Sequence, residues 1–425
     1  MLNYRNRIAD RVLEKKLKGI GAVLIEGPKL CGKTTTAEQA AASVLYLANP
    51  DEREQNLQMA KIKPTMLLQG DTPRLLDEWQ IAPEIWDAVR FEVDHRGTPG
   101  QFILTGSAVP PDRSQLYHSG TGRFSWLRMR TMSLYESGDS SGDISIKDLF
   151  EENEEIAAVA PDNDIEKIAY LVCRGGWPTT LDLEESIALD RAYDYYDAIV
   201  NIDISRVDGV KRDPERTKRL MKSYARNQGS QTSYEAIKAD MRVNDSDKLD
   251  TDTVVSYVQA LKKIYVIEDM PAWNPNIRSK SAIRTSDTRY FVDPSIAAAS
   301  LGIGPSDLIN DLNTFGFMFE TMCVRDLRVY TDALDGQVYH YRDKSGLECD
   351  AVIHLKDGRY GLIEIKLGGD ESIEQGACTL KKMNERIDVD KMHDPSFMMV
   401  LVGKGKYAYR RDDGVCVVPI GCLKD

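Results

Sequence analysis

Apolar residues in the first third of the chain recur with the two spacings that distinguish helices from strands. Residues that share one helical face predict an amphipathic helix over 4–18; they are Ile8, Val12, Leu13 and Leu17. Short apolar or alternating runs predict strands, and a helix-forming run follows the first of them at 36–42. The predicted strands are 22–25, 43–47, 74–80, 101–107 and 127–136. These elements together indicate an α/β fold.

The rest of the chain contains a helical middle and a second α/β region. A turn-rich acidic break at 137–143 ends the first region. Helices are predicted at 165–171, 214–227, 233–241 and 252–263, followed by a strand at 265–268. Short helices followed by a hairpin favour a winged helix. The C-terminal part is predicted to hold a helix at 315–330 and strands at 337–342, 347–354 and 360–367. We therefore expect four regions: 1–137, a linker and helical region at 138–212, a winged-helix-like region at 213–300, and 301–425.

Residues 27–34 match the phosphate-loop pattern G-x-x-x-x-G-K-[ST] between a strand and a helix. The glycines let backbone N–H groups converge on one point, to which the helix N-terminus adds its positive dipole. That point fits a polyphosphate, with Lys33 against the β- and γ-phosphates and the Thr34 hydroxyl helping to hold Mg²⁺. The residues expected to contact ATP are Gly27, Pro28, Lys29, Cys31, Gly32, Lys33, Thr34 and Thr35.

Two adjacent carboxylates, Asp77 and Glu78, lie near the end of the predicted strand at 74–80, the second strand after the phosphate loop. In P-loop proteins that strand lies beside the one that feeds the loop, which puts Asp77 near the Mg²⁺ and lets Glu78 activate water. Adjacent acids also occur on ordinary surfaces, so their position after a phosphate loop carries this prediction. The end of the 101–107 strand either contacts the γ-phosphate or the attacking water, or is a simple turn.

These segments, together with Gly122-Arg123-Phe124 and a later Leu134-Tyr135-Glu136, resemble the AAA-type ATPase domain of a large prokaryotic family. Its members add a C-terminal domain of unknown function with a nuclease-like core, and the resemblance covers nearly the whole chain. It implies that Arg123 senses or stabilises γ-phosphate charge, in cis or from a neighbouring subunit of a homo-oligomer. A surface salt bridge is the alternative role for Arg123. The sequence departs from the family at 131–136, where members carry a Pro-Leu-Ser-Phe-like turn.

The C-terminal strands carry a set of acids and a lysine. Glu364 and Lys366 are two residues apart and so face one side of a strand, where Asp350 of the neighbouring strand can join them. With Glu320 on the preceding helix, this set resembles the PD-(D/E)xK nuclease superfamily. The resemblance implies that the three acids hold Mg²⁺ against a scissile phosphate, while the lysine positions water or stabilises charge. Plain ion pairs between strands, or a fold that serves binding or regulation, are the alternatives.

The middle region carries a basic run at 211–226 and a Gly-Gly-Trp-Pro element at 175–178. By the resemblance, residues 265–293 belong to a winged-helix element, a type of module that commonly binds DNA. The basic run lies on the first helix of that element and not on the expected recognition helix at 234–242. DNA contact and a solvated or protein-contacting face both stay open. The two glycines indicate either a close backbone approach or an ordinary turn.

Composition limits the class of protein. The chain has 425 residues, of which 42% are hydrophobic and 29% charged, as in multidomain soluble globular proteins. No apolar run approaches the roughly 18 residues that span a bilayer, so we expect a cytoplasmic protein without membrane contact. The net charge of -12 argues against a nonspecific nucleic-acid coat, although it allows a local basic face. Seven scattered cysteines and five histidines disfavour a disulfide framework or a zinc site.

The sequence thus predicts a multidomain ATPase that hydrolyses ATP with Mg²⁺. We expect a winged-helix-like middle to couple it to a PD-(D/E)xK-like module that acts on or near DNA. An ATP-gated binding switch that cuts nothing is one alternative. A DNA- or partner-recognition protein is the other.

Overall fold

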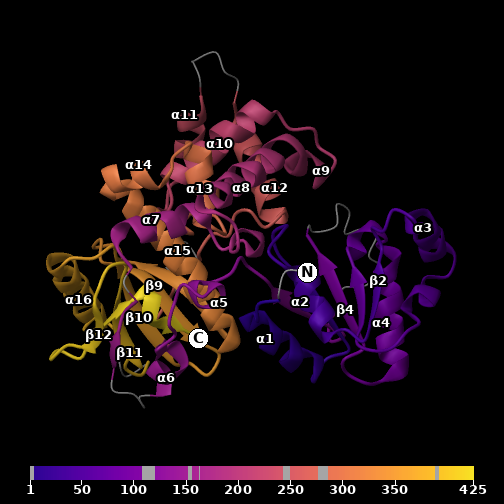
Figure 1. The fold of residues 1–425 in the computed structure, drawn as a ribbon, viewed down its shortest axis with the longest axis horizontal. Coiled ribbons are helices and arrows are strands. Elements are labelled where there is room, and N and C mark those ends of the chain that lie inside the picture. Colours follow the sequence, from indigo (N-terminus) through magenta and orange to yellow (C-terminus); the bar gives the residue numbers. More distant parts are fainter. Residues whose placement is uncertain are drawn as a thin grey trace. The chain divides into compact units, whose positions relative to one another are not determined.

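The computed structural model describes residues 4–107, 120–151, 156–161, 163–242, 249–275, 286–387 and 392–425. These residues form two compact units (Figure 1). The first unit comprises Met1–Thr131, Asn201–Arg212 and Gln259–Val266, and the second comprises Met132–Val200, Asp213–Val258 and Ile267–Asp425. Two pieces of the middle region therefore belong to the same unit as the phosphate loop.

A five-stranded parallel sheet forms the centre of the first unit, with the strand order β2-β3-β4-β1-β5. The strands are β1 (Ala22–Glu26), β2 (Ser43–Tyr46), β3 (Arg74–Asp77), β4 (Phe102–Gly106) and β5 (Phe124–Arg128). The helices are α1 (Ile8–Leu17), α2 (Lys33–Ala40), α3 (Arg53–Ile62), α4 (Glu84–Arg96) and the short α9 (Ile204–Arg206). The first predicted helix and the strands predicted at 22–25, 43–47 and 101–107 are confirmed, whereas the strand predicted at 74–80 ends at Asp77 and a short 3-10 helix, Trp79–Ile81, follows it.

The two faces of this sheet pack into separate cores, because successive residues of a strand point to opposite faces. Val23 and Ile25 of β1 pack in one core with buried residues of α1 and α2. Leu24, which lies between them, belongs to the other core with Trp86 of α4. Helices thus cover both faces of the sheet, which accounts for its nearly continuous apolar strands.

The expectation that the strand ending in Asp77 lies beside the strand feeding the phosphate loop was wrong. β4 separates the two, since it pairs with β1 on one side and with β3 on the other. β4 is buried along its whole length, whereas β3 begins with the partly exposed Arg74. The more apolar strand therefore takes the more central position.

The predicted strand at 127–136 was also wrong beyond its first residues. β5 ends at Arg128, and a short helix, α5 (Leu134–Ser137), occupies the end of the segment. Ser133 caps this helix: its side chain accepts a hydrogen bond from Glu136 N–H, and the Glu136 carboxylate accepts one from Ser133 N–H. The capping box overrides the alternating pattern of the sequence.

Helices dominate the middle of the second unit. They are α7 (Ile165–Arg174), α8 (Glu185–Ala198), α10 (Pro214–Arg226), α11 (Tyr234–Met241), α12 (Thr251–Lys263, which straddles the two units), α13 (Pro294–Leu301) and α14 (Pro305–Asn310). The strand expected at 265–268 is absent from the described residues, where Tyr265 has a left-handed φ of 60°. Two isolated antiparallel bridges, Ile267 with Phe291 and Met270 with Thr288, take its place. The expected hairpin residues 276–285 lie outside the described residues.

A seven-stranded mixed sheet forms the rest of the second unit, with the order β7-β12-β13-β11-β10-β9-β8. The strands are β7 (Ala157–Val159), β8 (Gly336–Arg342), β9 (Glu348–Leu355), β10 (Tyr360–Lys366), β11 (Phe397–Val402), β12 (Tyr407–Arg410) and β13 (Cys416–Pro419). Two helices pack on it, α15 (Leu312–Ala333) and α16 (Asp370–Asn384), and a small sheet joins β6 (Ile144–Ser145) to β14 (Leu423–Lys424). The predicted helix and the three predicted strands of this region are confirmed.

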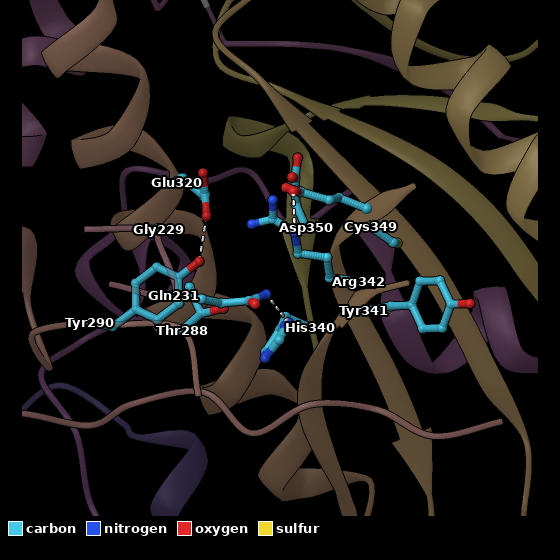
Figure 2. A pocket seen from close by; sticks show the side chains of 11 residues that line it. Gly229, Gln231, Thr288, Tyr290, Glu320, His340, Tyr341, Arg342, Cys349 and Asp350 are labelled. Atoms are coloured by element: carbon cyan, nitrogen blue, oxygen red, sulfur yellow. Dashed lines mark hydrogen bonds and ion pairs between the residues drawn. The ribbon is translucent and has the colours of Figure 1, made fainter. Parts of the chain in front are cut away.

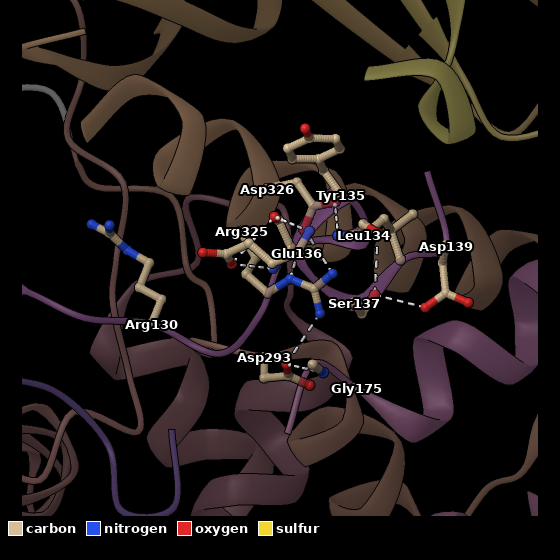
Figure 3. A network of polar contacts seen from close by, with 12 residues as sticks. Arg130, Leu134, Tyr135, Glu136, Ser137, Asp139, Gly175, Asp293, Arg325 and Asp326 are labelled. Carbon is tan, nitrogen blue, oxygen red and sulfur yellow. Dashed lines mark hydrogen bonds and ion pairs between the residues drawn. The ribbon is translucent and has the colours of Figure 1, made fainter. Parts of the chain in front are cut away.

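A buried polar network joins distant segments of the second unit (Figure 3). The Arg325 guanidinium pairs with Asp326 at 2.7 Å and with Asp293 at 3.2 Å, and all three side chains are at most 1% exposed. Asp326 also accepts the Leu134 N–H, and burial raises the pKa of Asp326 to about 6. The network therefore anchors the segment that follows Thr131.

The Gly-Gly-Trp-Pro element joins the same network through a close backbone approach. A Cβ on Gly175 would lie 2.3 Å from an Asp293 oxygen, and one on Gly176 would lie 2.1 Å from the Met132 carbonyl oxygen. The Met132 N–H also donates to the Gly176 carbonyl. Close approach, one of the two interpretations from the sequence, is the correct one.

Candidate functional site

The phosphate loop follows β1 and leads into α2. Gly32, the residue before the helix, has a left-handed φ of 100°. Gly27 has no room for a side chain, because a Cβ would lie 2.0 Å from the Met129 carbonyl oxygen. Both glycines are thus required by backbone geometry, as the motif predicts.

Lys33 is buried at the start of α2. Its ammonium donates to the carbonyl oxygens of Gly27 at 3.0 Å and Pro28 at 2.7 Å, so it bonds the loop that precedes it. An ammonium in this place lies at the N-terminus of a helix, where an anion is favoured. Thr35, the last of the expected contact residues, is exposed two residues further along the same turn.

The structure brings Thr34 and Asp77 together. The Thr34 hydroxyl donates to the Asp77 carboxylate at 2.7 Å, and the Thr105 hydroxyl of β4 donates to the same carboxylate oxygen at 2.7 Å. Asp77 is 7% exposed. The hydroxyl and the first of the two acids that the sequence singled out therefore share one polar cluster at the carboxyl ends of the strands.

Glu78 lies next to this cluster in a strained backbone conformation, with a left-handed φ of 56°. Its N–H donates to the Thr105 hydroxyl at 3.2 Å. Its carboxylate accepts hydrogen bonds from the Gln80 amide and, at 3.4 Å, from the Ser107 hydroxyl. The sequence offered Ser107 as one candidate contact but gave no signal for Gln80.

Arg7 and Asp203, which the sequence analysis missed, contact the phosphate loop. Arg7, which is 6% exposed, donates to the Cys31 carbonyl oxygen at 2.8 Å. Lys29 pairs with Asp203 at 2.6 Å. Asp203 lies 174 residues further along the chain, in the Asn201–Arg212 piece of the first unit. No local pattern could have indicated either contact.

Arg123 lies at the other end of the sheet from the phosphate loop. Phe124, the next residue, pairs with Ala22 at the start of β1, whereas Arg128 pairs with Glu26 at its end. Five residues of strand separate Arg123 from the loop end by about 16 Å. The Arg123 guanidinium pairs with Asp94 at 2.8 Å. This position does not fit the in-cis role that the resemblance implied, because Arg123 lies at the opposite end of the strand from the phosphate loop and pairs there with Asp94.

The C-terminal acids and lysine also meet. Lys366 pairs with Glu364 at 2.7 Å and with Asp350 at 3.2 Å. The ladder between β9 and β10 ends at the pair Ala351 and Ile363, and beyond it the Asp350 carboxylate accepts the Ile365 N–H at 2.8 Å. Asp350 therefore fills the place where the two strands separate.

Burial and mutual repulsion perturb this set. Burial, together with the Asp350 charge, raises the pKa of Glu364 to about 8 and that of Glu320 to about 8. Burial lowers the pKa of Lys366, but the charges of Asp350 and Glu364 outweigh it and raise the value. Paired groups with such perturbed pKa values are typical of functional sites, although structural ion pairs also produce them.

A pocket with about 310 Å³ of empty space, its open mouth included, lies beside this set (Figure 2). Figure 2 shows Tyr290 and Glu320 on one side, Asp350 and Arg342 on the other, and Tyr341 pointing away. The lining residues are Gly229, Gln231, Thr288, Tyr290, Glu320, His340, Tyr341, Arg342, Glu348, Cys349 and Asp350. The pocket therefore combines residues of the helical middle with the C-terminal acids.

His340 fixes the orientation of the Gln231 side chain at this pocket. Its Nε2 faces the Ser286 carbonyl oxygen at 3.1 Å and so carries the proton, which leaves Nδ1 to accept from the Gln231 amide at 3.2 Å. Burial lowers the pKa of His340 to about 4. The imidazole is therefore neutral at physiological pH.

Divalent cations such as Mg²⁺ prefer oxygen ligands, which both sites supply. Among the described residues, however, no three His, Cys, Asp or Glu side chains converge as a group that could hold a metal ion. At the C-terminal site the Lys366 ammonium stands between Asp350 and Glu364, the place of a shared cation. The oxygen donors fit a divalent cation. A cation could bind between Asp350 and Glu364, however, only if the Lys366 ammonium moved away from these two carboxylates.

The basic run on α10 is partly neutralised by nearby acids. Lys218 pairs with Glu215 at 3.0 Å, and Arg226 pairs with Asp240 at 2.8 Å. Lys222 is exposed. These pairs fit the interpretation of a solvated face at least as well as that of a DNA-binding face.

No helix in the described part of the chain is long and apolar enough to cross a membrane.

Three family models match parts of the chain. Residues 20–137 match the model of an AAA domain, whereas residues 165–307 and 315–423 match two domains of unknown function, DUF8612 and DUF4143. The chain therefore carries a P-loop AAA domain, which supports ATP binding and hydrolysis. The other two matches assign no activity.

Two curated proteins with similar sequences are named as uncharacterized. The uncharacterized protein Rv2008c of Mycobacterium tuberculosis is 23% identical over 380 residues, which cover 88% of this chain and 76% of that protein. The uncharacterized protein Mb2031c of Mycobacterium bovis matches with the same figures.

Two solved structures are also similar in part. The Walker-type ATPase paby2304 of Pyrococcus abyssi is 14% identical with a TM-score of 0.42, and the match covers 71% of this chain and 99% of that one. The signal transduction ATPase PH0952 of Pyrococcus horikoshii, which has a tetratricopeptide repeat sensor, is 14% identical with a TM-score of 0.25. That match covers 79% of this chain and 48% of the other.

Proposed function

We propose that the first unit hydrolyses ATP with Mg²⁺ and that Lys33, Thr34, Asp77 and Glu78 carry the reaction. The observation that carries this proposal is the pair of 2.7 Å hydrogen bonds from Thr34 and Thr105 to one Asp77 oxygen. These bonds place a hydroxyl and a carboxylate together at the start of α2, beside a second acid. Oxygen donors in this place fit Mg²⁺.

The chain's own residues divide the work between binding and proton transfer. Lys33 exchanges its bonds to the Gly27 and Pro28 carbonyls for the β- and γ-phosphates. Thr34 and Asp77 are the groups that would hold Mg²⁺, which when bound neutralises phosphate charge. Glu78 orients the attacking water and accepts its proton. Gln80 and Ser107, which donate to the Glu78 carboxylate, fix its direction.

Substitution of the loop lysine tests this assignment. Lys33→Ala is expected to abolish ATP turnover, because the buried ammonium that bonds the Gly27 and Pro28 carbonyl oxygens is the group proposed to contact the phosphates. Lys18→Ala is the matched control, since Lys18 is an exposed lysine of the same unit whose ion pair, within the described part of the chain, is with the exposed Glu14. Wild-type turnover in purified Lys33→Ala would refute the proposal.

A second candidate function belongs to the C-terminal sheet: metal-dependent cleavage of a nucleic-acid phosphodiester, controlled by the ATPase unit. The convergence of Asp350, Glu364 and Lys366 at the point where β9 and β10 separate favours it. In this proposal Asp350 and Glu364 would hold a divalent cation, and Lys366 would position water or stabilise developing charge. The alternative is a site that binds a nucleic acid or a protein without cutting it.

Plasmid, linear and single-stranded DNA distinguish these two functions. Wild type and the double variant Glu364→Ala, Lys366→Ala are incubated with each DNA and Mg²⁺ or Mn²⁺, with and without ATP. Cleavage that the double variant loses supports the nuclease function. Absence of cleavage by a wild type that still hydrolyses ATP rejects it in favour of a recognition module.

A further inference from the structure

The phosphate loop contacts a segment that lies far along the chain. Lys29, the third residue of the loop, pairs with Asp203 at 2.6 Å. Asp203 is the last residue of a π-helical turn, Ile199–Asp203, and its side chain is 10% exposed, whereas the Lys29 side chain is 48% exposed. A single π-helical turn is rare in proteins and is frequently found at functional sites. The contact therefore joins a mostly buried acid to a loop lysine that solvent can reach.

The backbone of the loop beside Lys29 is strained. Leu30, the next residue, has a left-handed φ of 62°, and its side chain is 61% exposed. A leucine rarely adopts such a φ, and this conformation persists only where the surrounding structure holds it. The exposed Leu30 side chain contributes little packing, so contacts of its neighbours must hold the loop. The pair of Lys29 with Asp203 is one of these contacts.

The segment that carries Asp203 is braced by its own side chains. The Arg212 guanidinium donates to the Ile204 carbonyl oxygen at 2.9 Å and pairs with Asp208 at 2.7 Å, and the Arg212 side chain is 2% exposed. The Asp208 carboxylate also lies 3.9 Å from the ammonium of Lys263, which belongs to another piece of the same unit. These bonds hold residues 204–212 together, so the segment that follows Asp203 can move as one piece.

A second cation ties these pieces of the first unit to its sheet. The Arg128 guanidinium carbon lies 4.8 Å from the centre of the Tyr265 ring, within the range of a cation–π attraction. Arg128 pairs with Glu26, the residue before the phosphate loop. Both contacts therefore lie at the loop end of the sheet, but Lys29 is the cation that is also expected to contact phosphates.

We propose that Asp203 and bound nucleotide compete for the Lys29 ammonium, so that the Asn201–Arg212 segment is a strap on the phosphate loop that nucleotide loosens. This inference rests on the ATP-binding function proposed above. A polyphosphate in the loop carries several negative charges and attracts the Lys29 side chain, which is exposed enough to turn toward it. The same charges repel the Asp203 carboxylate. Nucleotide binding therefore weakens the contact in two ways.

Calorimetric titration of the full chain with Mg²⁺ and AMP-PNP, an ATP analogue that is not hydrolysed, tests the competition. Asp203→Asn keeps the shape of the side chain and removes its charge, so it should tighten AMP-PNP binding by about 3- to 5-fold, the upper range for a partly exposed ion pair. Asp208→Asn is the matched control. It removes an equal charge from the same segment, but the Asp208 carboxylate pairs with Arg212 and Lys263. The control should leave the affinity for AMP-PNP nearly unchanged.

Hydrogen–deuterium exchange of the backbone amides at 201–212 tests the strap. AMP-PNP should speed this exchange in wild type, whereas in Asp203→Asn the exchange should be fast without nucleotide and unchanged by it. Lys29→Met, which removes the other partner, should show the same exchange while it weakens AMP-PNP binding.

Two results would overturn the strap even where wild type binds AMP-PNP. One is an affinity that Asp203→Asn leaves equal to that of wild type or weakens. The other is wild-type exchange at 201–212 that AMP-PNP slows or leaves unchanged. Wild type that binds no AMP-PNP would instead overturn the ATP-binding function on which the strap rests.

Discussion

Thr105 on β4 offers a sharp test of the proposed ATPase site, because one hydroxyl serves both acids. It donates to the Asp77 carboxylate at 2.7 Å and accepts the Glu78 N–H at 3.2 Å. Thr105→Val keeps the shape of the side chain, which is 1% exposed, and removes both bonds. The perturbation therefore changes the position of the acids without removing either of them.

The size of the effect follows from the two bonds. A hydrogen bond to a charged group contributes about 1.5–3 kcal/mol and a neutral one about 0.5–1.5 kcal/mol. If about half of their sum is lost from the transition state, kcat falls by about 5- to 40-fold, at about 1.4 kcal/mol for each factor of ten. The KM for ATP should change little, because Lys33 and the loop backbone remain.

Steady-state ATP hydrolysis and urea denaturation of the same preparations separate catalysis from stability. Thr36→Val is the control, since Thr36 is equally buried in α2 and its hydroxyl bonds Tyr4 at 3.1 Å and neither acid. The control should lose about 1 kcal/mol of stability with kcat nearly unchanged. A Thr105→Val protein that loses stability like the control but keeps its kcat would show that Thr105 does not position the acids.

Three further predictions concern other parts of the chain. Arg325→Met leaves the buried carboxylates of Asp293 and Asp326 without their cation and should cost about 3–5 kcal/mol of unfolding free energy, measured in urea; a loss below about 1 kcal/mol contradicts the network. The folded-state pKa of Glu364, raised to about 8, means that the folded chain binds more protons than the unfolded chain between about pH 4.5 and 8. Stability should therefore fall as pH rises through that window, by up to about 1.4 kcal/mol per pH unit, and Glu364→Gln should flatten the fall; an unchanged slope contradicts it. Arg123→Ala should lower ATP turnover, and mixing it with Lys33→Ala should restore activity if Arg123 acts on a neighbouring subunit; unchanged turnover leaves only its salt bridge with Asp94.

The residues with the clearest chemistry could be predicted because their patterns are local. The phosphate loop needs a strand, two glycines and a helix within a short stretch, and the sequence shows all three. Glu364 and Lys366 share a strand face for the same local reason. The order of the strands could not be predicted with equal success. β4 enters between β1 and β3 because its buried length suits the centre of the sheet, and that competition between strands has no local pattern.

The residues that hold these sites escape sequence analysis for a different reason. Thr105, Asp203 and Tyr290 each make a hydrogen bond or an ion pair to a side chain that lies 28, 174 and 30 residues away, respectively. A threonine, an aspartate or a tyrosine at such a position reads as an ordinary core or surface residue. Only the fold shows that each lies against a functional group.

The Lys29 and Asp203 pair shows how such a contact bears on the relation between the two proposed functions. Asp203 is 8% exposed, and its carboxylate pairs with the Lys29 ammonium at 2.6 Å. A polyphosphate bound in the loop attracts the same ammonium. The Asn201–Arg212 piece that carries Asp203 leads directly into Asp213 and α10 of the second unit, through the chain itself. We therefore expect bound nucleotide to compete with Asp203 for Lys29, at a segment that is continuous in the chain with the helical middle.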